Sequence, residues 1–476
     1  MEHVSRPVIV PCGQRSTAGA KPLTYFLTFH GKLVYMVPHD GALILVQCPV
    51  DATNLAAELV SVDVPVERFR AGFDDYLADR QPVLDGTLMV RRLGACQIAH
   101  AHNPRSVSLT WRGRRLCALD DGRVADDVSA PDWEGFLPIS DTELAMLRTM
   151  LANDWVVRSS GELVRAADVA MGAWYTLRIG PLELDLRYQL PFDDAQFPFR
   201  LTVLKEGWRI EQFCLYRPLI YFTAFRSPVI FRQCDIAIRS LLEFGEYDGH
   251  ILLITDQPAD ALPAALPALP PDRFRTCHVI AADGAGFLAA RFKIVDFPWA
   301  AQFQPVMFMD CDVVFDAPVA PMLCAMARSD QISAPLEPFS PMRSSPAAGS
   351  GLLQLEGLAP GFAVGMNFGT VGIPNIPAHA ATLRLIRRIM MDHALLHGRT
   401  VLPYHDQEVA NYVAFRLTSF GPAIHPFVRY GGWPNTEPAI DGRVGLVHFW
   451  PALRGEDKLV AMQRYHARID AASKPP

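Results

Sequence analysis

Asp310 and Asp312 are the residues of this chain best suited to holding a metal ion. They follow the apolar residues 305–309, and one residue separates them. In an extended strand, residues i and i+2 point to the same side, so this spacing predicts two carboxylates directed at one point. Two oxygen ligands suit a hard divalent cation, magnesium or manganese. A solvated turn after a strand is the alternative for an Asp-x-Asp pair taken alone.

The segments around these aspartates predict an α/β sheet. Short apolar runs and helical patterns alternate from residue 218 onward, at 219–224, 229–244, 251–256, 277–281 and 286–301. Strands that alternate with helices of this length indicate a parallel sheet covered by helices. Ligands bind beyond the carboxyl ends of the strands in such sheets. Asp310 and Asp312 fall at such an end.

Further polar residues of the second half could complete a site. Arg291 lies in the helical pattern before the aspartates, where a surface ion pair is the ordinary alternative. Asn367 and Gly369 lie in a strand-like run, in which a bulge would explain them equally well. Asp406 and Gln407 open a predicted helix, and an acid in the first turn suits the helix dipole or a cap.

His448 lies at the end of a predicted strand near the C-terminus. Arg454 and Lys458 follow it six and ten residues later. An imidazole can bind a divalent cation, and a basic side chain nearby could contact phosphate. An ordinary buried histidine is the alternative for His448 taken alone.

The order of these motifs resembles the family 8 glycosyltransferases of the GT-A fold, over residues 218–471. The family has an Asp-x-Asp that ends a strand, then Asn-x-Gly, then Asp-Gln-x-x-x-Asn, then His-Phe, and the chain has all four in this order. The resemblance implies a Rossmann-like GT-A domain. It also implies transfer of a sugar, with retention, from a nucleotide-diphosphate donor such as a UDP-sugar to a hydroxyl acceptor. The acceptor could be a carbohydrate, a lipid-linked molecule or a protein.

The resemblance also implies a role for each matching residue near the metal. Asp310, Asp312 and His448 would hold a manganese (or magnesium) ion that bridges the donor diphosphate, which makes Asp310 a donor-binding residue as well. Arg291 would contact the diphosphate or position the carboxylates.

The same resemblance places other residues around the donor. Thr223 and Ala224 would lie beside the base and ribose. Asn367, Asp406 and Gln407 would line the sugar where the bond is exchanged.

The chain departs from the family after its histidine. The family usually has a glycine there and a Lys-Pro-Trp about six residues on, whose lysine binds phosphate. Arg454 stands six residues on and Lys458 ten residues on. Arg454 is preferred as the phosphate ligand because a guanidinium can bind phosphate through two hydrogen bonds.

The first half, residues 23–190, has a β-rich pattern. Asp-Gly turns after His39 and after Asp120 predict hairpins. Turn-type glycines recur about every forty residues, at Gly41, Gly86, Gly122 and Gly161.

Residues 112–139 resemble one lobe of the fascin-like β-trefoils. The match rests on Arg115-Leu-Cys-Ala-Leu-Asp-Asp-Gly followed by Trp133-Glu-Gly-Phe. A trefoil would imply a glycan- or protein-binding accessory module, and a β-rich packing domain is an equal alternative.

The remaining segments and the composition limit the other possibilities. Residues 1–22 and 472–476 are predicted tails, and 191–217 a bridge between the halves.

A net charge of −6 gives no basic surface for nucleic acid. No apolar run approaches the ~18 residues of a transmembrane helix, and no secretory signal is recognisable. Nine cysteines without Cys-x-x-Cys pairs indicate reduced thiols in a cytoplasmic protein.

Two other functions fit parts of the pattern. A nucleotidyltransferase would need a glycine-rich loop after Ala224, which the sequence lacks. A lectin-like module fused to a degenerate transferase would be a binding protein, but the presence of Asp310, Asp312 and His448 together argues against degeneration.

Overall fold

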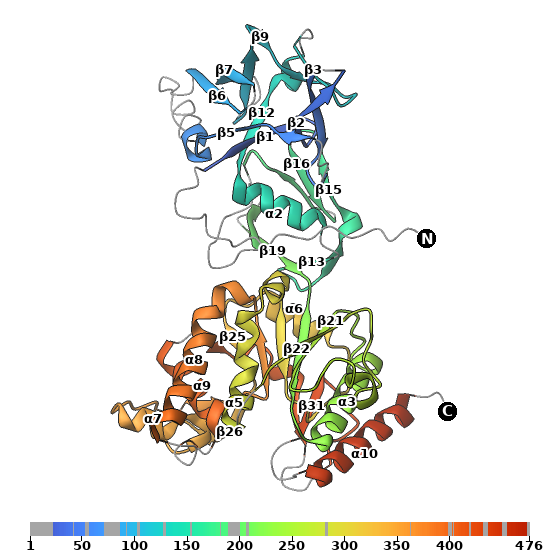
Figure 1. Cartoon of the computed structure of the whole chain (residues 1–476), viewed down its shortest axis with the longest axis vertical. Helices are drawn as coiled ribbons and strands as arrows, with labels where there is room; N and C mark the ends of the chain where they lie inside the picture. The colour runs from blue at the N-terminus through green and yellow to red at the C-terminus, as the bar shows by residue number, and fades with distance from the viewer. Residues whose placement is uncertain are drawn as a thin grey trace. The chain divides into compact units, whose positions relative to one another are not determined.

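The computed structural model divides into two compact units, Met1–Leu215 and Tyr216–Pro476 (Figure 1). We describe each unit by itself. The structure describes residues 22–473 other than 41, 53–56, 71–85, 92, 102–104, 127–129, 153–154, 181, 189–199, 206–208, 281–283, 362, 398–401, 403, 418–419, 432–436 and 450–454.

The first unit consists mainly of short strands. Its elements are β1 (Thr24–Thr28), β2 (Lys32–His39), β3 (Ala42–Pro49), β4 (Glu58–Leu59), β5 (Ser61–Val62), β6 (Gly86–Val90), β7 (Gly94–His100), β8 (Val107–Trp111), β9 (Arg114–Arg115), β10 (Cys117–Ala118), β11 (Val124–Ala125), β12 (Phe136–Ser140), α2 (Asp141–Ala152), β13 (Trp155–Arg158), β14 (Leu163–Arg165), β15 (Val169–Gly172), β16 (Thr176–Ile179), β17 (Leu182–Asp185), β18 (Arg200–Lys205) and β19 (Arg209–Tyr216).

Six strands of this unit form a closed antiparallel ring among the described residues. The ring runs β1-β12-β8-β7-β6-β5 and returns to β1. A buried cluster contains side chains from all six of these strands, among them Phe26, Val62, Ile98 and Phe136. A closed ring removes free strand edges, but it does not distinguish a trefoil from another barrel. The β-trefoil therefore stays a prediction.

Both predicted Asp-Gly hairpins join paired strands. β2 pairs with β3 up to His39 opposite Ala42, and β10 pairs with β11. Gly122 has a φ of +92° and Gly161 of +91°, as turn glycines require. Gly86 instead begins β6, and Gly41 lies outside the described residues. The forty-residue spacing of glycines therefore does not mark four equivalent turns.

The predicted bridge between the halves is largely β structure. β18 and β19 pair with each other, and β19 joins the sheet β14-β13-β19-β18. Phe213 and Leu215 on β19 belong to the hydrophobic core of the first unit. This core also contains Leu144 and Leu147 of α2.

The second unit has α/β architecture. Its elements are β20 (Leu219–Ala224), α3 (Pro228–Glu243), β21 (His250–Thr255), α4 (Leu262–Ala265), β22 (Phe274–His278), α5 (Gly284–Ala289), the 3₁₀ helices η3 (Ala290–Asp296) and η4 (Pro298–Gln302), β23 (Val306–Met309), β24 (Val313–Phe315), α6 (Ala320–Ala327), β25 (Ile332–Ser333), β26 (Leu336–Pro341), the 3₁₀ helix η5 (Pro346–Ala348), α7 (Ser350–Leu355), β27 (Val364–Met366), β28 (Thr370–Ile373), α8 (Ile376–His397), α9 (His405–Leu417), β29 (Phe420–Gly421), β30 (Val428–Gly431), β31 (Leu446–Phe449) and α10 (Gly455–Ser473).

The main sheet of this unit is mixed, whereas the sequence predicted a parallel one. Its order is β22-β21-β20-β23-β28-β25-β29. The first four strands are parallel, but β28 runs against β23. The chain enters β28 through residues 367–369, whose Gly369 carbonyl accepts a hydrogen bond from the N–H of Asp310 just after β23. From that position β28 can pair with β23 only by running back along it.

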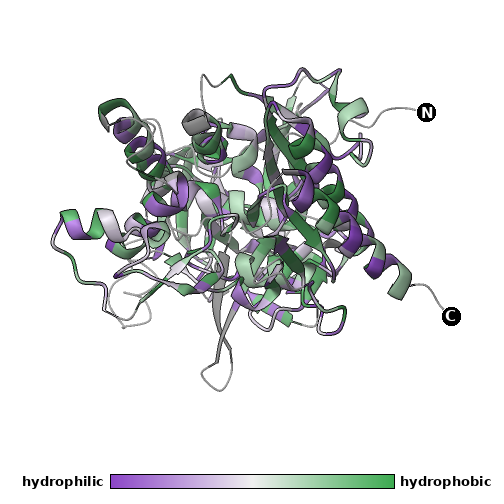
Figure 2. Ribbon diagram, turned by 90° about the horizontal axis from the view of Figure 1, so that it is seen from below, coloured by the Kyte–Doolittle hydropathy of each residue, from purple (hydrophilic) through white to green (hydrophobic). Residues whose placement is uncertain are grey.

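A second, three-stranded sheet has the order β24-β31-β30 and packs against α10. Val314, Val447, Met462 and Tyr465 form part of the buried cluster between them. Figure 2 shows hydrophobic and hydrophilic residues alternating along α10, as expected of a helix with one buried face. No helix among the described residues is long and apolar enough to cross a membrane.

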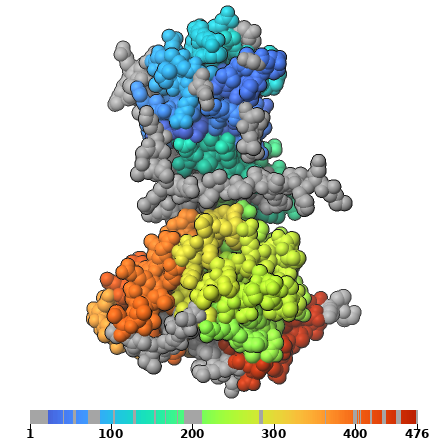
Figure 3. Space-filling model, in the orientation of Figure 1, coloured from blue at the N-terminus to red at the C-terminus, as the bar shows by residue number. Residues whose placement is uncertain are grey.

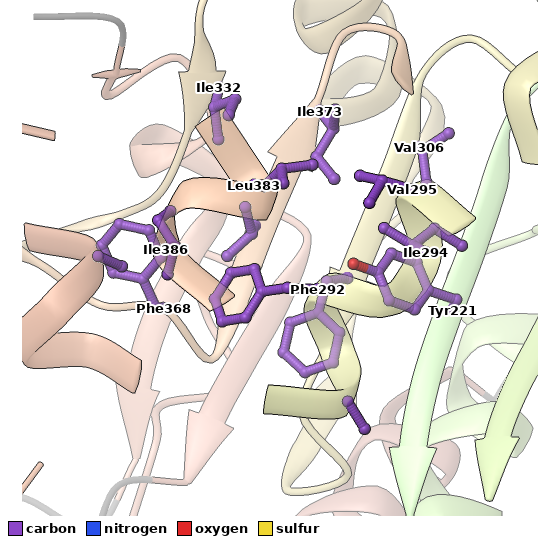
Figure 4. Close-up of a cluster of buried hydrophobic side chains, with 14 of the residues drawn as sticks. Tyr221, Phe292, Ile294, Val295, Val306, Ile332, Phe368, Ile373, Leu383 and Ile386 are labelled. Carbon is purple, nitrogen blue, oxygen red and sulfur yellow. The ribbon is translucent and has the colours of Figure 1, made fainter. Parts of the chain in front are cut away.

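The predicted helix at residues 286–301 consists of three short pieces, α5, η3 and η4. Pro298 begins η4, where its missing N–H prevents a continuous α-helix. Phe292 and Ile294 of η3 pack with Tyr221, Phe368 and Leu383 in the main core (Figure 4). Ala290, just before Arg291, belongs to the same core, so buried residues fix the backbone on both sides of Arg291. On the face seen in Figure 3, segments from the whole length of the second unit contribute to one surface.

Candidate metal and donor site

The three predicted metal ligands lie together. Asp310, Asp312 and His448 each offer one ligand atom, and these atoms all lie within 4.8 Å of one another. The cause differs from the predicted one. β23 ends at Met309, and residues 310–312 form the connection to β24 instead of an extended strand. A turn, and not strand alternation, therefore brings the two carboxylates together.

His448 is placed by the pairing of two strands. It lies within β31, opposite Val313 of β24. Its Nε2 atom is 3.1 Å from Asp312 Oδ1, and the N–H of the next residue, Phe449, donates to the Asp312 carbonyl at 2.9 Å. The side chain of His448 is buried. The β24–β31 ladder therefore holds the imidazole against Asp312.

The space between these ligands is kept open by Gly369. A Cβ atom there would lie 2.5 Å from His448 Cε1 and 2.7 Å from Asp310 Oδ2, closer than real Cβ atoms come. Gly369 donates its N–H to Asn367 Oδ1 at 2.9 Å. Two carboxylates and an imidazole around such a space are suitable ligands for manganese or magnesium. The residues present therefore fit a divalent cation.

The two carboxylates differ in their electrostatic environment. Burial raises the pKa of Asp310 to about 6, although Arg291 opposes the shift. Burial acts in the same direction on Asp312, but His448 and Lys458 outweigh it and hold the pKa of Asp312 well below its usual range. Burial lowers the pKa of His448, and the charge of Asp312 outweighs this, so its pKa is raised. Carboxylate and imidazole ligands bind a metal in their deprotonated forms, so metal binding would release protons here.

Arg291 joins two of the predicted motifs. Its guanidinium is 3.0 Å from Asp310 Oδ1 and 2.8 Å from Asp406 Oδ2. It also donates to the Phe368 carbonyl at 3.0 Å and lies over the ring of Phe308, 4.3 Å from the centroid. The side chain is almost fully buried. These contacts place Arg291 against two carboxylates, and its role at a metal or a donor stays a prediction.

Asn367 and Gln407 are joined by a residue that the sequence did not reveal. The Glu337 carboxylate accepts from Asn367 Nδ2 at 2.6 Å and from Gln407 Nε2 at 3.0 Å. Glu337 lies on β26 and is buried. Its partners are 30 and 70 residues away in the chain, so no local pattern could indicate the contact. Asn367 lies in the connection between β27 and β28, and not within a strand as predicted.

We call Asp310, Asp312 and His448 the metal group. Lys458 is a second basic residue, besides Arg291, that contacts it. Its Nζ is 2.5 Å from Asp312 Oδ2, and the first turn of α10 carries it there. Arg454, the preferred phosphate ligand, lies outside the described residues.

Thr223 and Ala224 end β20, the strand beside β23. The Thr223 carbonyl accepts a hydrogen bond from the Cys311 thiol at 3.2 Å, so Thr223 lies next to the aspartate turn. Ala224 is buried.

This arrangement could bind an anionic ligand through a cation. Asp310 and Asp312 follow the carboxyl end of β23, where ligands of α/β sheets bind, and His448 of β31 lies beside them. Arg291 contacts one aspartate and Lys458 the other, so two cationic side chains flank the group. A divalent ion would balance the two carboxylates, so Arg291 and Lys458 would leave the group with a net positive charge. Such a site suits a ligand with phosphate groups.

Comparisons with known proteins add little to this geometry. No protein-family model matches the chain, and no curated protein matches it in sequence. Among solved structures, the chain is similar to the galactosyltransferase LgtC, in complex with donor and acceptor sugar analogues. The identity is 18% and the TM-score 0.39, over 54% of this chain and 97% of that one. A similarity of this degree does not establish the family of the chain.

Proposed function

We propose that the second unit is a GT-A glycosyltransferase, similar to family 8, that depends on a divalent cation. It transfers a sugar from a UDP-sugar to a hydroxyl acceptor, with retention. One observation carries the proposal: the ligand atoms of Asp310 and Asp312, and of His448 from a distant part of the chain, lie within 4.8 Å of one another. Arg291 joins one of them, Asp310, to Asp406 from a third motif.

The metal side of the proposed site would bind the donor diphosphate. Asp310, Asp312 and His448 hold the ion, manganese in preference to magnesium because one ligand is an imidazole. When bound, the ion supplies Lewis-acid stabilisation of the charge that develops on the leaving diphosphate. Lys458 is our choice for the phosphate ligand because its ammonium group already lies at Asp312. Arg454 stays the alternative.

The rest of the donor would lie along the edge of the sheet. Thr223 and Ala224 at the end of β20 contact the base and ribose. Asn367, Asp406 and Gln407 line the sugar, and the contacts made by Arg291 and Glu337 keep their polar groups in place.

A panel of nucleotide sugars tests this function. The full chain is incubated with each donor and manganese, and release of nucleoside diphosphate is measured. We expect release from a UDP-sugar, loss of release on chelation, and loss in the Asp312→Ala variant while its unfolding transition persists. Near-normal turnover by Asp312→Ala, or turnover that chelation leaves unchanged, would overturn the proposal.

Thermal unfolding gives a second measurement that does not require the acceptor. A ligand that binds only the folded state raises its melting temperature. We expect UDP to raise it only when manganese is present. A shift without metal, or with other nucleotides alone, contradicts the proposed donor. Binding without turnover of any donor would favour the binding-protein alternative.

We also propose that the first unit is a β-trefoil that binds a glycan or a protein. The closed ring of six strands supports a barrel of this kind. Binding of the full chain to a glycan array tests the glycan alternative, and saturable binding that free sugar displaces is the expected result.

A further inference from the structure

α10 has a second polar contact with β24, away from the metal group. Asp316 follows β24, and its side chain is fully buried. Its Oδ2 accepts from the Tyr465 hydroxyl of α10 at 2.9 Å and from the guanidinium of Arg429 on β30. Arg429 also donates to the Tyr465 oxygen at 2.6 Å. We call Asp316, Arg429 and Tyr465 the anchor triad.

The anchor triad and the metal group lie at opposite ends of the same short strand. Asp312 precedes β24 and bonds Lys458, whereas Asp316 follows it and bonds Tyr465. Lys458 and Tyr465 are seven residues apart on α10, which places them on one face about 10.5 Å apart. The two aspartates flank the three residues of β24, so they are separated by about 13 Å at most. α10 and the segment 312–316 are thus held together at two points, and the distance between these points is similar along the helix and along the segment.

The anchor triad also fixes the strand that carries His448. Gly445, just before β31, donates its N–H to Asp316 Oδ1 at 3.2 Å and accepts from the Asp316 N–H at 2.9 Å. The ring of Tyr465 packs on Phe449, the residue after His448, with centroids 6.0 Å apart. A slip of one residue in β31 would turn His448 to the other face of the sheet. The triad opposes such a slip.

The chemistry of the triad indicates a role in register. A buried ion pair is often no more stabilising than an apolar cluster of the same size. Here it lies beside the apolar residues Val314, Val447 and Met462, which already pack α10 on the sheet. A directional network among them adds little packing, but it specifies one alignment of β24, β31 and α10.

We propose that Asp316, Arg429 and Tyr465 are positioning residues that set the affinity of the cation site without touching the ion. They align His448 and Lys458 with Asp312. The inference rests on the metal site of the proposed function, but not on sugar transfer.

The Tyr465→Phe variant tests this. It removes one hydroxyl and keeps the ring on Phe449. Manganese binding to the full chain is measured by calorimetry, and stability by urea unfolding. We expect the dissociation constant for manganese to rise about fivefold or more, as is usual for coupling between separate sites. Met462→Ala is the control, because Met462 is buried on the same helix but has no polar group to align. Met462→Ala should lose more stability than Tyr465→Phe, but its manganese affinity should stay closer to that of the unchanged chain.

Turnover gives a readout that lost stability alone would not produce. We expect Tyr465→Phe to need more manganese for half-maximal turnover and to reach the same maximum. Arg429→Lys should show the same effect if Tyr465→Phe folds poorly. Equal manganese affinity in Tyr465→Phe and the unchanged chain would overturn the inference, as would a loss of affinity that follows stability across all three variants. Manganese binding without sugar transfer would overturn only the proposed function.

Discussion

Val313 and His448 face each other across the antiparallel pair formed by β24 and β31. Asp312 is the residue just before Val313, so this register sets its carboxylate beside the imidazole, at 3.1 Å. The metal group therefore depends on strand pairing as well as on the identity of its three ligands. Variants that keep every ligand can still lose the metal.

Gly369→Ala is such a variant. The new Cβ would lie 2.5 Å from His448 Cε1 and 2.7 Å from Asp310 Oδ2. Overpacking of this kind costs about 1–3 kcal/mol, and here the ligands must separate to relieve it. We expect manganese binding, measured by calorimetry, to weaken about tenfold, as ~1.4 kcal/mol would produce. Gly351→Ala is the control, since its Cβ meets only Glu408 Oε1 at 3.5 Å. Equal affinities in the two variants would contradict the role of Gly369.

Glu337→Gln should separate the sugar part of the site from the metal part. Glu337 accepts hydrogen bonds from both Asn367 and Gln407, and an amide presents a donor in place of one acceptor. Misplaced positioning groups can cost about 100-fold in rate, so we expect turnover to fall about 10- to 100-fold and manganese affinity to stay unchanged. Glu356→Gln, at a half-exposed acid, should leave both unchanged. Lost manganese binding in Glu337→Gln would show a wider structural role.

Glu408 should make stability depend on pH. It is buried on α9, and burial raises its pKa to about 7. The unfolded chain loses this proton near pH 4.5, the ordinary value. Between these values the folded state binds more protons, so the free energy of unfolding falls as pH rises from 4.5 to 7 and then levels off. Urea unfolding of the chain and of Glu408→Gln at pH 5, 6, 7 and 8 measures this. The free energy of unfolding of the chain, minus that of Glu408→Gln, should fall between pH 4.5 and 7 and then level off. A difference that stays constant over this range would contradict the prediction.

The second unit should fold by itself if the chain is cut at the right residue. We expect a fragment of residues 216–476 to unfold cooperatively and to bind manganese with the affinity of the full chain. A start at Gln212 would leave Phe213 and Leu215 exposed, because both belong to the core of the first unit. That longer fragment should be less soluble. An insoluble fragment 216–476 would show that the division after Leu215 is wrong.

The sequence predicted the parts of the site that local patterns encode. The apolar run before Asp310 predicted a buried strand, and β23 is fully buried. The helical pattern at 229–244 corresponds closely to α3. The metal group could be predicted from the order of its motifs, although the argument from strand alternation was wrong for Asp312.

Other features depend on contacts that no local pattern records. The antiparallel direction of β28 follows from where the chain enters the sheet. Glu337 is recognisable only through Asn367 and Gln407, which lie far away in the sequence. Arg454 was preferred over Lys458 for its hydrogen-bonding capacity, but the first turn of α10 brings Lys458 to Asp312. The roles of these residues at a donor stay predictions.

The reversed direction of β28 has a consequence for how the length of this unit can change. The residues before β28, and not those after it, reach the edge of the sheet that carries Asp310. An insertion before Thr370 would move Gly369 away from His448. An insertion after Ile373 would fall at the other end of the strand, about 13 Å away. Added or deleted residues in related chains should therefore occur after Ile373 and be absent just before Thr370.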